Sequence, residues 1–125
     1  MSDKQSLGPN QTFWLKELRS GKYEQGKTDL CHNGKYCCLG IAAEIFATGQ
    51  TEIHITKGIK YFDSCLSSAP EYVMDSLGLY KDLGETSSLT FDENALAKMN
   101  DQGKTFAEIA DIIEQDPSVY FKEPR

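Results

Sequence analysis

The chain has 125 residues, of which 39% are hydrophobic and 26% charged, and its formal net charge is −6. This length supports one domain with a buried core. An acidic chain is a poor general binder of nucleic acid, because neutralising phosphates requires clustered Lys and Arg. We find no signal peptide and no apolar stretch near the ~20 residues of a membrane span, so we expect a cytosolic protein with four reduced cysteines.

The charge is unevenly distributed along the chain. Residues 1–40 carry six Lys or Arg against four Asp or Glu, whereas residues 41–125 carry seven against fifteen, giving +2 and −8. A surplus of acid usually serves solubility. Because residues 1–40 carry a surplus of cationic side chains, we expect any site for an anion in the N-terminal third.

The first elements are a flexible leader and a short helix. Residues 1–9 are polar and predict the leader, and residues 10–125 predict a single globular domain. Asn10 or Thr12 is a typical N-cap for a helix that continues to Ser20. Trp14 and Leu18 are four residues apart on its apolar side, so we predict that Trp14 anchors the helix in the core.

A hairpin that leads into a second helix follows. Asn33-Gly34 is typical of a type I′ turn, so residues 23–31 and 35–38 are predicted to pair, with Cys31 opposite Tyr36. The next helix is expected from residue 39 to about residue 47, which places Cys38 at or next to its N-terminus. Gly40 costs about 1 kcal/mol in that helix relative to Ala. Close backbone packing or an approaching ligand would compensate for this cost.

The second half of the chain predicts another hairpin and three helices. Residues 51–56 alternate polar and apolar as in a half-buried strand, and Lys57-Gly58 turns the chain into a partner strand over residues 59–62. Capping boxes at residues 68–71 and 105–108 open two helices, and a short helix over residues 92–99 lies between them. Residues 89–91 are a short strand or an extended connection, and residues 119–121 are expected to dock on the core. We predict an α+β fold, a single domain with two β-hairpins forming a small antiparallel sheet packed by about four helices.

Three stretches carry a resemblance to a known family. They are residues 14–25 with Tyr-Cys-Cys-Leu-Gly at 36–40, Pro-Glu-Tyr-Val at 70–73 leading to Leu-Gly-Leu at 77–79, and Met-Asn-Asp-Gln-Gly-Lys-Thr-Phe-Ala-Glu-Ile-Ala at 99–110. In these the chain resembles an uncharacterised family of small proteins from tailed bacteriophages and prophages. The resemblance implies a phage-encoded accessory protein in the cytosol of the bacterial host. It implies no catalytic residues.

A cysteine hydrolase or transferase is one functional hypothesis. Gln25-Gly26 followed by a cysteine at a helix start is similar to the papain-type arrangement, with Cys38 as nucleophile, Gln25 at the oxyanion and His54 or His32 as base. The chain has only two histidines, and it lacks the usual local signature around the cysteine. Alternatively, Cys37 and Cys38 are small buried hydrophobic residues at a strand-to-helix junction, with no catalytic role.

Metal and DNA sites are weakly indicated. The spacing of the potential ligands does not fit the short pairs that zinc prefers, so we predict no metal, and no motif predicts a cofactor. These residues are Cys31, His32, Cys37, Cys38, His54 and Cys65. Residues 99–113 suggest a helix-turn-helix, but Glu108, Asp111 and Glu114 on its exposed side would repel phosphates, so direct contact with nucleic acid is not expected.

A binding module is the preferred hypothesis. Cationic and aromatic side chains in the N-terminal third could hold a small anion such as a nucleotide, with stacking on tyrosine and contacts at a helix N-terminus. The predicted ligand-binding residues are Arg19, Lys22, Tyr23, Gln25, Lys27, Tyr36, Gly40, Asn100 and Asp101. We expect the protein to sequester a host nucleotide signal or to inhibit a host protein. A solvated basic edge, a structural role in the virion and a homo-oligomer stay open as alternatives.

Overall fold

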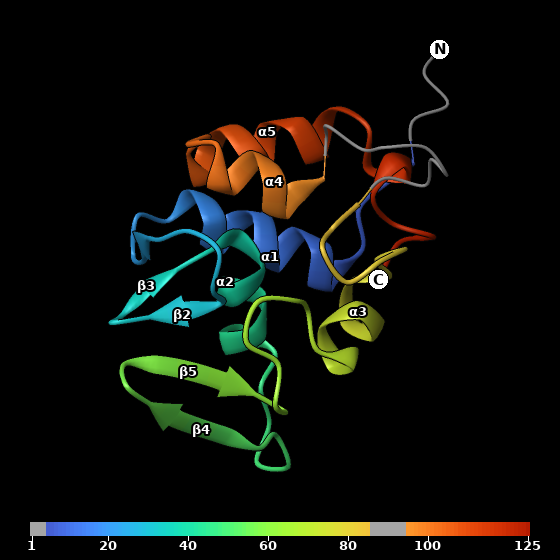
Figure 1. Cartoon of the computed structure of the whole chain (residues 1–125). Helices are drawn as coiled ribbons and strands as arrows, with labels where there is room; N and C mark the ends of the chain where they lie inside the picture. The colour runs from blue at the N-terminus through green and yellow to red at the C-terminus, as the bar shows by residue number, and fades with distance from the viewer. Residues whose placement is uncertain (1–4, 86–94) are drawn as a thin grey trace.

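The computed structural model describes residues 5–85 and 95–125, which form a single α+β domain (Figure 1). The helices are α1 (Pro9–Arg19), α2 (Cys38–Ile45), α3 (Glu71–Leu77), α4 (Leu96–Asp101), α5 (Phe106–Gln115) and the 3₁₀ helix η1 (Pro117–Val119). The strands are β1 (Glu24–Gln25), β2 (Cys31–His32), β3 (Lys35–Tyr36), β4 (Ile53–Thr56) and β5 (Ile59–Phe62). The predicted α+β class is confirmed.

The strands form one mixed sheet in the order β1-β3-β2-β5-β4. Asn33 and Gly34 have φ angles of 52° and 79°, which confirms the two-residue turn, and Cys31 lies opposite Tyr36 as predicted. The prediction of a purely antiparallel sheet is wrong, because β1 pairs with β3 in parallel. The chain leaves the sheet after β1 through a loop in which Thr28 has a φ of 69°, and it returns as β2 on the other side of β3.

The helix ends differ in how well local sequence predicted them. The capping box of α5 forms as expected: Glu108 N–H donates to Thr105 Oγ1 at 3.1 Å, and Thr105 N–H donates to Glu108 Oε1 at 2.9 Å. The box predicted at residues 68–71 is wrong, because Pro70 is the N-cap of α3 and has no side-chain capping bond. Gly78 ends α3 with a φ of 73°.

The first and fourth helices begin at other residues than predicted. Pro9 is the first residue of α1, where a missing N–H costs nothing, and Gln11 Oε1 accepts a bond from Gly8 N–H at 2.9 Å. Neither Asn10 nor Thr12 caps the helix. The helix α4 begins at residue 96 and includes residues 100 and 101. The short strand or extended connection predicted at residues 89–91 and the start of the helix predicted at residue 92 lie outside the described residues.

The core surrounds α1, which packs against α2, α3 and α5 (Figure 1). Trp14 is fully buried, as predicted, and its Nε1–H donates to the carbonyl of Cys38 at 3.1 Å. The Trp14 ring meets that of Phe121 edge-on at 6.3 Å, so the C-terminal segment docks on the core as expected. Burial of two large aromatic rings is worth several kcal/mol, which fixes α1 at the centre of the domain.

The outer hairpin lies beyond the helices. All four residues of β4 are exposed, so the prediction of a half-buried strand is wrong. The helix α2 packs against β3 near the other end of the sheet, and the hairpin of β4 and β5 projects away from α4 and α5 (Figure 1). No helix within the described ranges is both long enough and apolar enough to cross a membrane.

Candidate functional site

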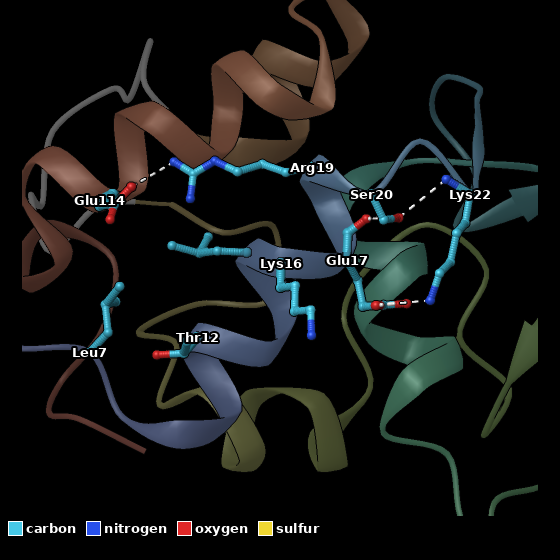
Figure 2. A pocket seen from close by; sticks show the side chains of 9 residues that line it. Leu7, Thr12, Lys16, Glu17, Arg19, Ser20, Lys22 and Glu114 are labelled. Atoms are coloured by element: carbon cyan, nitrogen blue, oxygen red, sulfur yellow. Dashed lines mark hydrogen bonds and ion pairs between the residues drawn. The ribbon is translucent and has the colours of Figure 1, made fainter.

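A groove of about 500 Å³ runs along the exposed side of α1 (Figure 2). Three cationic side chains line it, from two successive turns of the helix and the loop that follows. The lining residues are Leu7, Thr12, Leu15, Lys16, Glu17, Arg19, Ser20, Lys22 and Glu114. The volume is that of a typical small-molecule site. Two of the predicted ligand-binding residues, Arg19 and Lys22, line this groove, with their charged ends toward opposite sides of it (Figure 2).

Arg19 is held at one edge of the groove by two carboxylates of α5. Its Nη2 lies 2.7 Å from Asp111 Oδ1 and 2.6 Å from Glu114 Oε1. The hydrogen bond to Asp111, assisted by Glu114, raises the pKa of Arg19, so the guanidinium stays charged. Both ion pairs use Nη2, and Figure 2 shows the second terminal nitrogen turned away from Glu114. Within the described ranges, Nη1 and Nε therefore keep donors for a ligand.

Glu17 supplies a buried carboxylate at the other edge. Its side chain is only 8% exposed, and it accepts bonds from Lys22 Nζ at 3.4 Å and from Tyr23 Oη at 3.2 Å. Burial and the contact with Glu17 raise the pKa of Tyr23. Because a buried carboxylate without partners is costly, these two bonds are needed to keep Glu17 in place. Lys22, which is 66% exposed, still has ammonium protons that point to solvent or a ligand.

The two tyrosines predicted to stack on a ligand pack on each other instead. The rings of Tyr23 and Tyr36 meet edge-on with centroids 5.3 Å apart. The hydroxyl of Tyr36 donates to Glu44 Oε1 at 2.7 Å, and Lys60 Nζ lies 2.6 Å from the same oxygen. Burial and the bond to Glu44 raise the pKa of Tyr36. Burial opposes ionisation of Glu44, but the bonds from Lys60 and Tyr36 outweigh it and lower the pKa of this carboxyl.

Asn100 and Gln25 meet in a second polar cluster, away from the groove. Asn100 is fully buried, and its Oδ1 accepts from Gln25 Nε2 at 2.9 Å and from the N–H of Cys38 at 3.2 Å. Its Nδ2 donates to the carbonyl of Gly26 at 2.9 Å. One amide thus connects α4, the loop after β1 and the first turn of α2. Both groups of the Asn100 side chain are bonded, so the residue has a structural role in this arrangement.

Three other predicted ligand-binding residues also lie outside the groove. Asp101 Oδ1 accepts a bond from the N–H of Thr28 at 2.7 Å, which fixes the loop after β1. Lys27 is exposed and does not line the groove. A Cβ on Gly40 would lie 1.7 Å from the carbonyl oxygen of Leu30. Close backbone packing therefore explains this glycine.

The proposed thiol nucleophile and its proposed base are not assembled. Cys38 is fully buried, its Sγ lies 3.6 Å from the carbonyl of Leu96, and burial raises its pKa well above the ordinary value. His54 is on the exposed strand β4, where its ring contacts Thr56 and Tyr61. The other proposed base, His32, is exposed on β2, with its Nδ1 3.5 Å from Asp29 Oδ2. A nucleophile needs an accessible thiolate with a base in hydrogen-bond reach. This geometry offers neither for Cys38.

The remaining thiols form no metal centre with the other candidates. Among the described residues, no three His, Cys, Asp or Glu side chains gather in a way that could hold a metal ion. Cys31 and Cys37 are buried in the core, and Cys65 is partly exposed. Burial raises the pKa of Cys37 to about 11, which keeps it a neutral thiol near neutral pH.

Sequence reasoning missed the acidic half of the groove. Glu17 and Glu114 were not among the predicted site residues, although both line the groove with Arg19 and Lys22. One signal was available: Glu17 lies three residues after Trp14, close to the apolar stripe of α1. A charged side chain in that position must find partners. The contact between Arg19 and α5 spans more than ninety positions of sequence, and no local pattern predicts it.

Comparison with known proteins finds one family. Its profile, described as a domain of unknown function (DUF8296), matches residues 10–117. No curated protein and no solved structure matches the chain. The matched range includes the five strands of the sheet and the helices α2 to α5 of the described residues, and it includes α1 from its second residue onward.

Proposed function

The chain belongs to this family of domains of unknown function, and we propose that it acts by binding a small phosphate-bearing molecule in the groove beside α1. The observation that carries the proposal is the gathering of Lys16, Arg19 and Lys22 around one groove in a chain whose net charge is −6. The predicted role as a phage accessory protein that sequesters a host nucleotide agrees with this chemistry. It rests on the resemblance and is part of the proposal.

The ion pairs of Arg19 do not prevent binding of an anion. Asp111 and Glu114 are 66% and 50% exposed, and ion pairs at such positions contribute about 0–1 kcal/mol. A phosphate that bonds to Nη1 gains a charge-assisted hydrogen bond of about 1.5–3 kcal/mol. The carboxylates hold the guanidinium in position, and the ligand bonds to the terminal nitrogen that they leave unused, Nη1.

The other groups on the groove complete the fit to a phosphate. Lys16 makes no ion pair with any residue of the described ranges, and Lys22 lies one loop further on. The hydroxyl of Thr12 supplies a neutral donor, whereas that of Ser20 already donates to the carbonyl of Glu17 at 2.7 Å. Leu7 and Leu15 supply an apolar surface. The paired tyrosines do not line the groove, so recognition of a base by stacking is not part of the proposal. We therefore expect the phosphates to contribute most of the affinity.

Isothermal titration calorimetry with adenosine diphosphate and with inorganic pyrophosphate tests the proposal. We expect binding of both, weakened at least about tenfold by Arg19→Ala, since that variant removes charge-assisted bonds. Lys27→Ala is the matched control, because it removes the same charge at an exposed site outside the groove. Absence of binding at millimolar concentration, or equal loss in both variants, would refute the groove as the site.

Native mass spectrometry of the protein purified from a bacterial host addresses the natural ligand. The chain has a mass of 14.0 kDa, so a bound nucleotide adds a mass that is easily resolved. We expect the added mass to disappear on denaturation and to be recovered as an intact phosphate compound. Recovery of a cleaved compound would indicate an enzyme instead.

A further inference from the structure

The strand β4 is an open edge of the sheet. It has a strand neighbour only on the side of β5 within the described residues. Thr56 and Ile59 flank the two-residue turn and form a hydrogen-bonded pair, as such turns require. Hydrogen-bonded and non-hydrogen-bonded pairs alternate in antiparallel strands, so the backbone of His54 also faces β5. The N–H and C=O groups of Ile53 and Ile55 therefore point outward.

Apart from its short length, β4 lacks the usual protections of an edge strand. Its four residues include no proline and no charged side chain, and their pairing with β5 is continuous, without a bulge. Ile53 is 43% exposed and Ile55 65%, and the two lie on one face of the strand. An edge that combines unpaired backbone groups with exposed β-branched side chains is a template for another strand.

A second copy of the same strand fits this edge. When two copies run antiparallel about His54, Ile53 of each lies opposite Ile55 of the other. Both residues have outward backbone groups, so each such pair exchanges two hydrogen bonds, four in all. The same register places the isoleucines of both copies side by side on one face. A shift by one residue would break both matches.

Charge favours the same arrangement. Glu52 precedes β4 and Lys57 follows it, so the strand has an acidic and a basic end. Antiparallel pairing about His54 brings Glu52 of one copy beside Thr56 and Lys57 of the other, at both ends of the interface. A parallel copy would place like charges together. We propose that β4 pairs with β4 of a second copy, which joins the two five-stranded sheets into one.

The dimer is expected to be weak and reversible. Four residues from each copy bury far less than the roughly 1,200 Å² of standard specific interfaces. Sedimentation equilibrium of the wild-type chain should therefore show concentration-dependent dimerisation. Ile55→Lys places a charge opposite Ile53 of the other copy, and we expect it to weaken the dimer at least about tenfold. Ile55→Thr retains β propensity and should weaken the dimer less.

A cysteine scan tests the register directly. His54 lies on the two-fold axis, opposite itself, so His54→Cys should form a disulfide-linked dimer under mild oxidation. Thr56 is on the same face of the strand and is exposed, as His54 is. In this register it lies opposite Glu52 of the other copy, so Thr56→Cys should not form a disulfide between the two copies. The wild-type chain, with its partly exposed Cys65, gives the background.

Two results would overturn the proposal. One is a chain that remains monomeric at roughly millimolar concentration, where even weak interfaces associate. The other is a dimer in which Thr56→Cys cross-links as well as His54→Cys, since the register about His54 excludes it. Thermal unfolding of each variant below the dimerisation range shows whether the monomer is folded. Because β4 lies outside the groove beside α1, this result is independent of ligand binding.

Discussion

Replacing Asn100 by alanine removes the amide that joins α4 to the loop after β1 and to α2. The buried N–H of Cys38 loses its acceptor at 3.2 Å, and the carbonyl of Gly26 loses its donor at 2.9 Å. Gln25 loses one of two acceptors but keeps its bond to the carbonyl of Lys104 at 2.7 Å. The variant therefore leaves buried backbone groups without partners, which is the costly way to lose a hydrogen bond.

The expected cost follows from these bonds. An unsatisfied buried N–H costs about 1–3 kcal/mol, and the part-buried carbonyl adds about 0.5–1.5 kcal/mol. Asn100→Ala should therefore lower the free energy of unfolding by about 3 kcal/mol. In a domain of this size that corresponds to a fall in Tm of roughly 10 °C. Urea unfolding monitored by circular dichroism gives the free energy, and a calorimetric scan gives Tm.

The neighbouring residue provides the control for this experiment. Asp101 makes one exposed bond, to the N–H of Thr28, so Asp101→Ala should cost less than about 1 kcal/mol. If Asn100→Ala were as stable as Asp101→Ala, solvent would have to satisfy the Cys38 N–H. The role that we assign to the buried amide would then be wrong.

Three further predictions follow from local geometry. Gly40→Ala inserts a Cβ 1.7 Å from a backbone carbonyl oxygen and should lower Tm severely. Gly49→Ala, whose added Cβ would have nothing within 4 Å, should leave Tm unchanged. Thermal scans of both variants measure the difference, and equal Tm values would contradict the close packing at Gly40. With a thiol reagent near neutral pH, Cys65 should react first and the three buried thiols only after unfolding; a fast reaction elsewhere would contradict their burial. The bond from Thr105 N–H lowers the pKa of Glu108, so this carboxylate stabilises the fold above its unfolded pKa and loses that effect as pH falls through the folded value. The difference in urea midpoint between wild type and Glu108→Gln should therefore close below about pH 4, and a difference that is constant with pH would contradict the capping bond.

Local sequence determined the turn at residues 33–34, the cap of α5 and the largest core residue. Asn33-Gly34 forms the two-residue turn because asparagine and glycine tolerate positive φ, whatever the rest of the chain does. Thr105 and Glu108 close a capping box through atoms three residues apart. Trp14 is buried because a short helix needs a large apolar contact. The turn and the cap depend only on residues close together in the chain, and the apolar spacing within one helix was enough to predict that Trp14 is buried, although its contacts are distant in sequence.

Only the tertiary structure decided how distant segments meet. The parallel pairing of β1 with β3 depends on the path of the loop that follows β1. The exposure of β4 depends on which part of the sheet the helices cover. Asn100 was predicted as a ligand residue from its polarity, yet it is buried because α4 packs on α2. Arg19 was predicted as a site residue from its charge, but its partners on α5 could not be foreseen. Sequence patterns specify local geometry, whereas the environment of a polar side chain depends on long-range contacts that have no periodic signature.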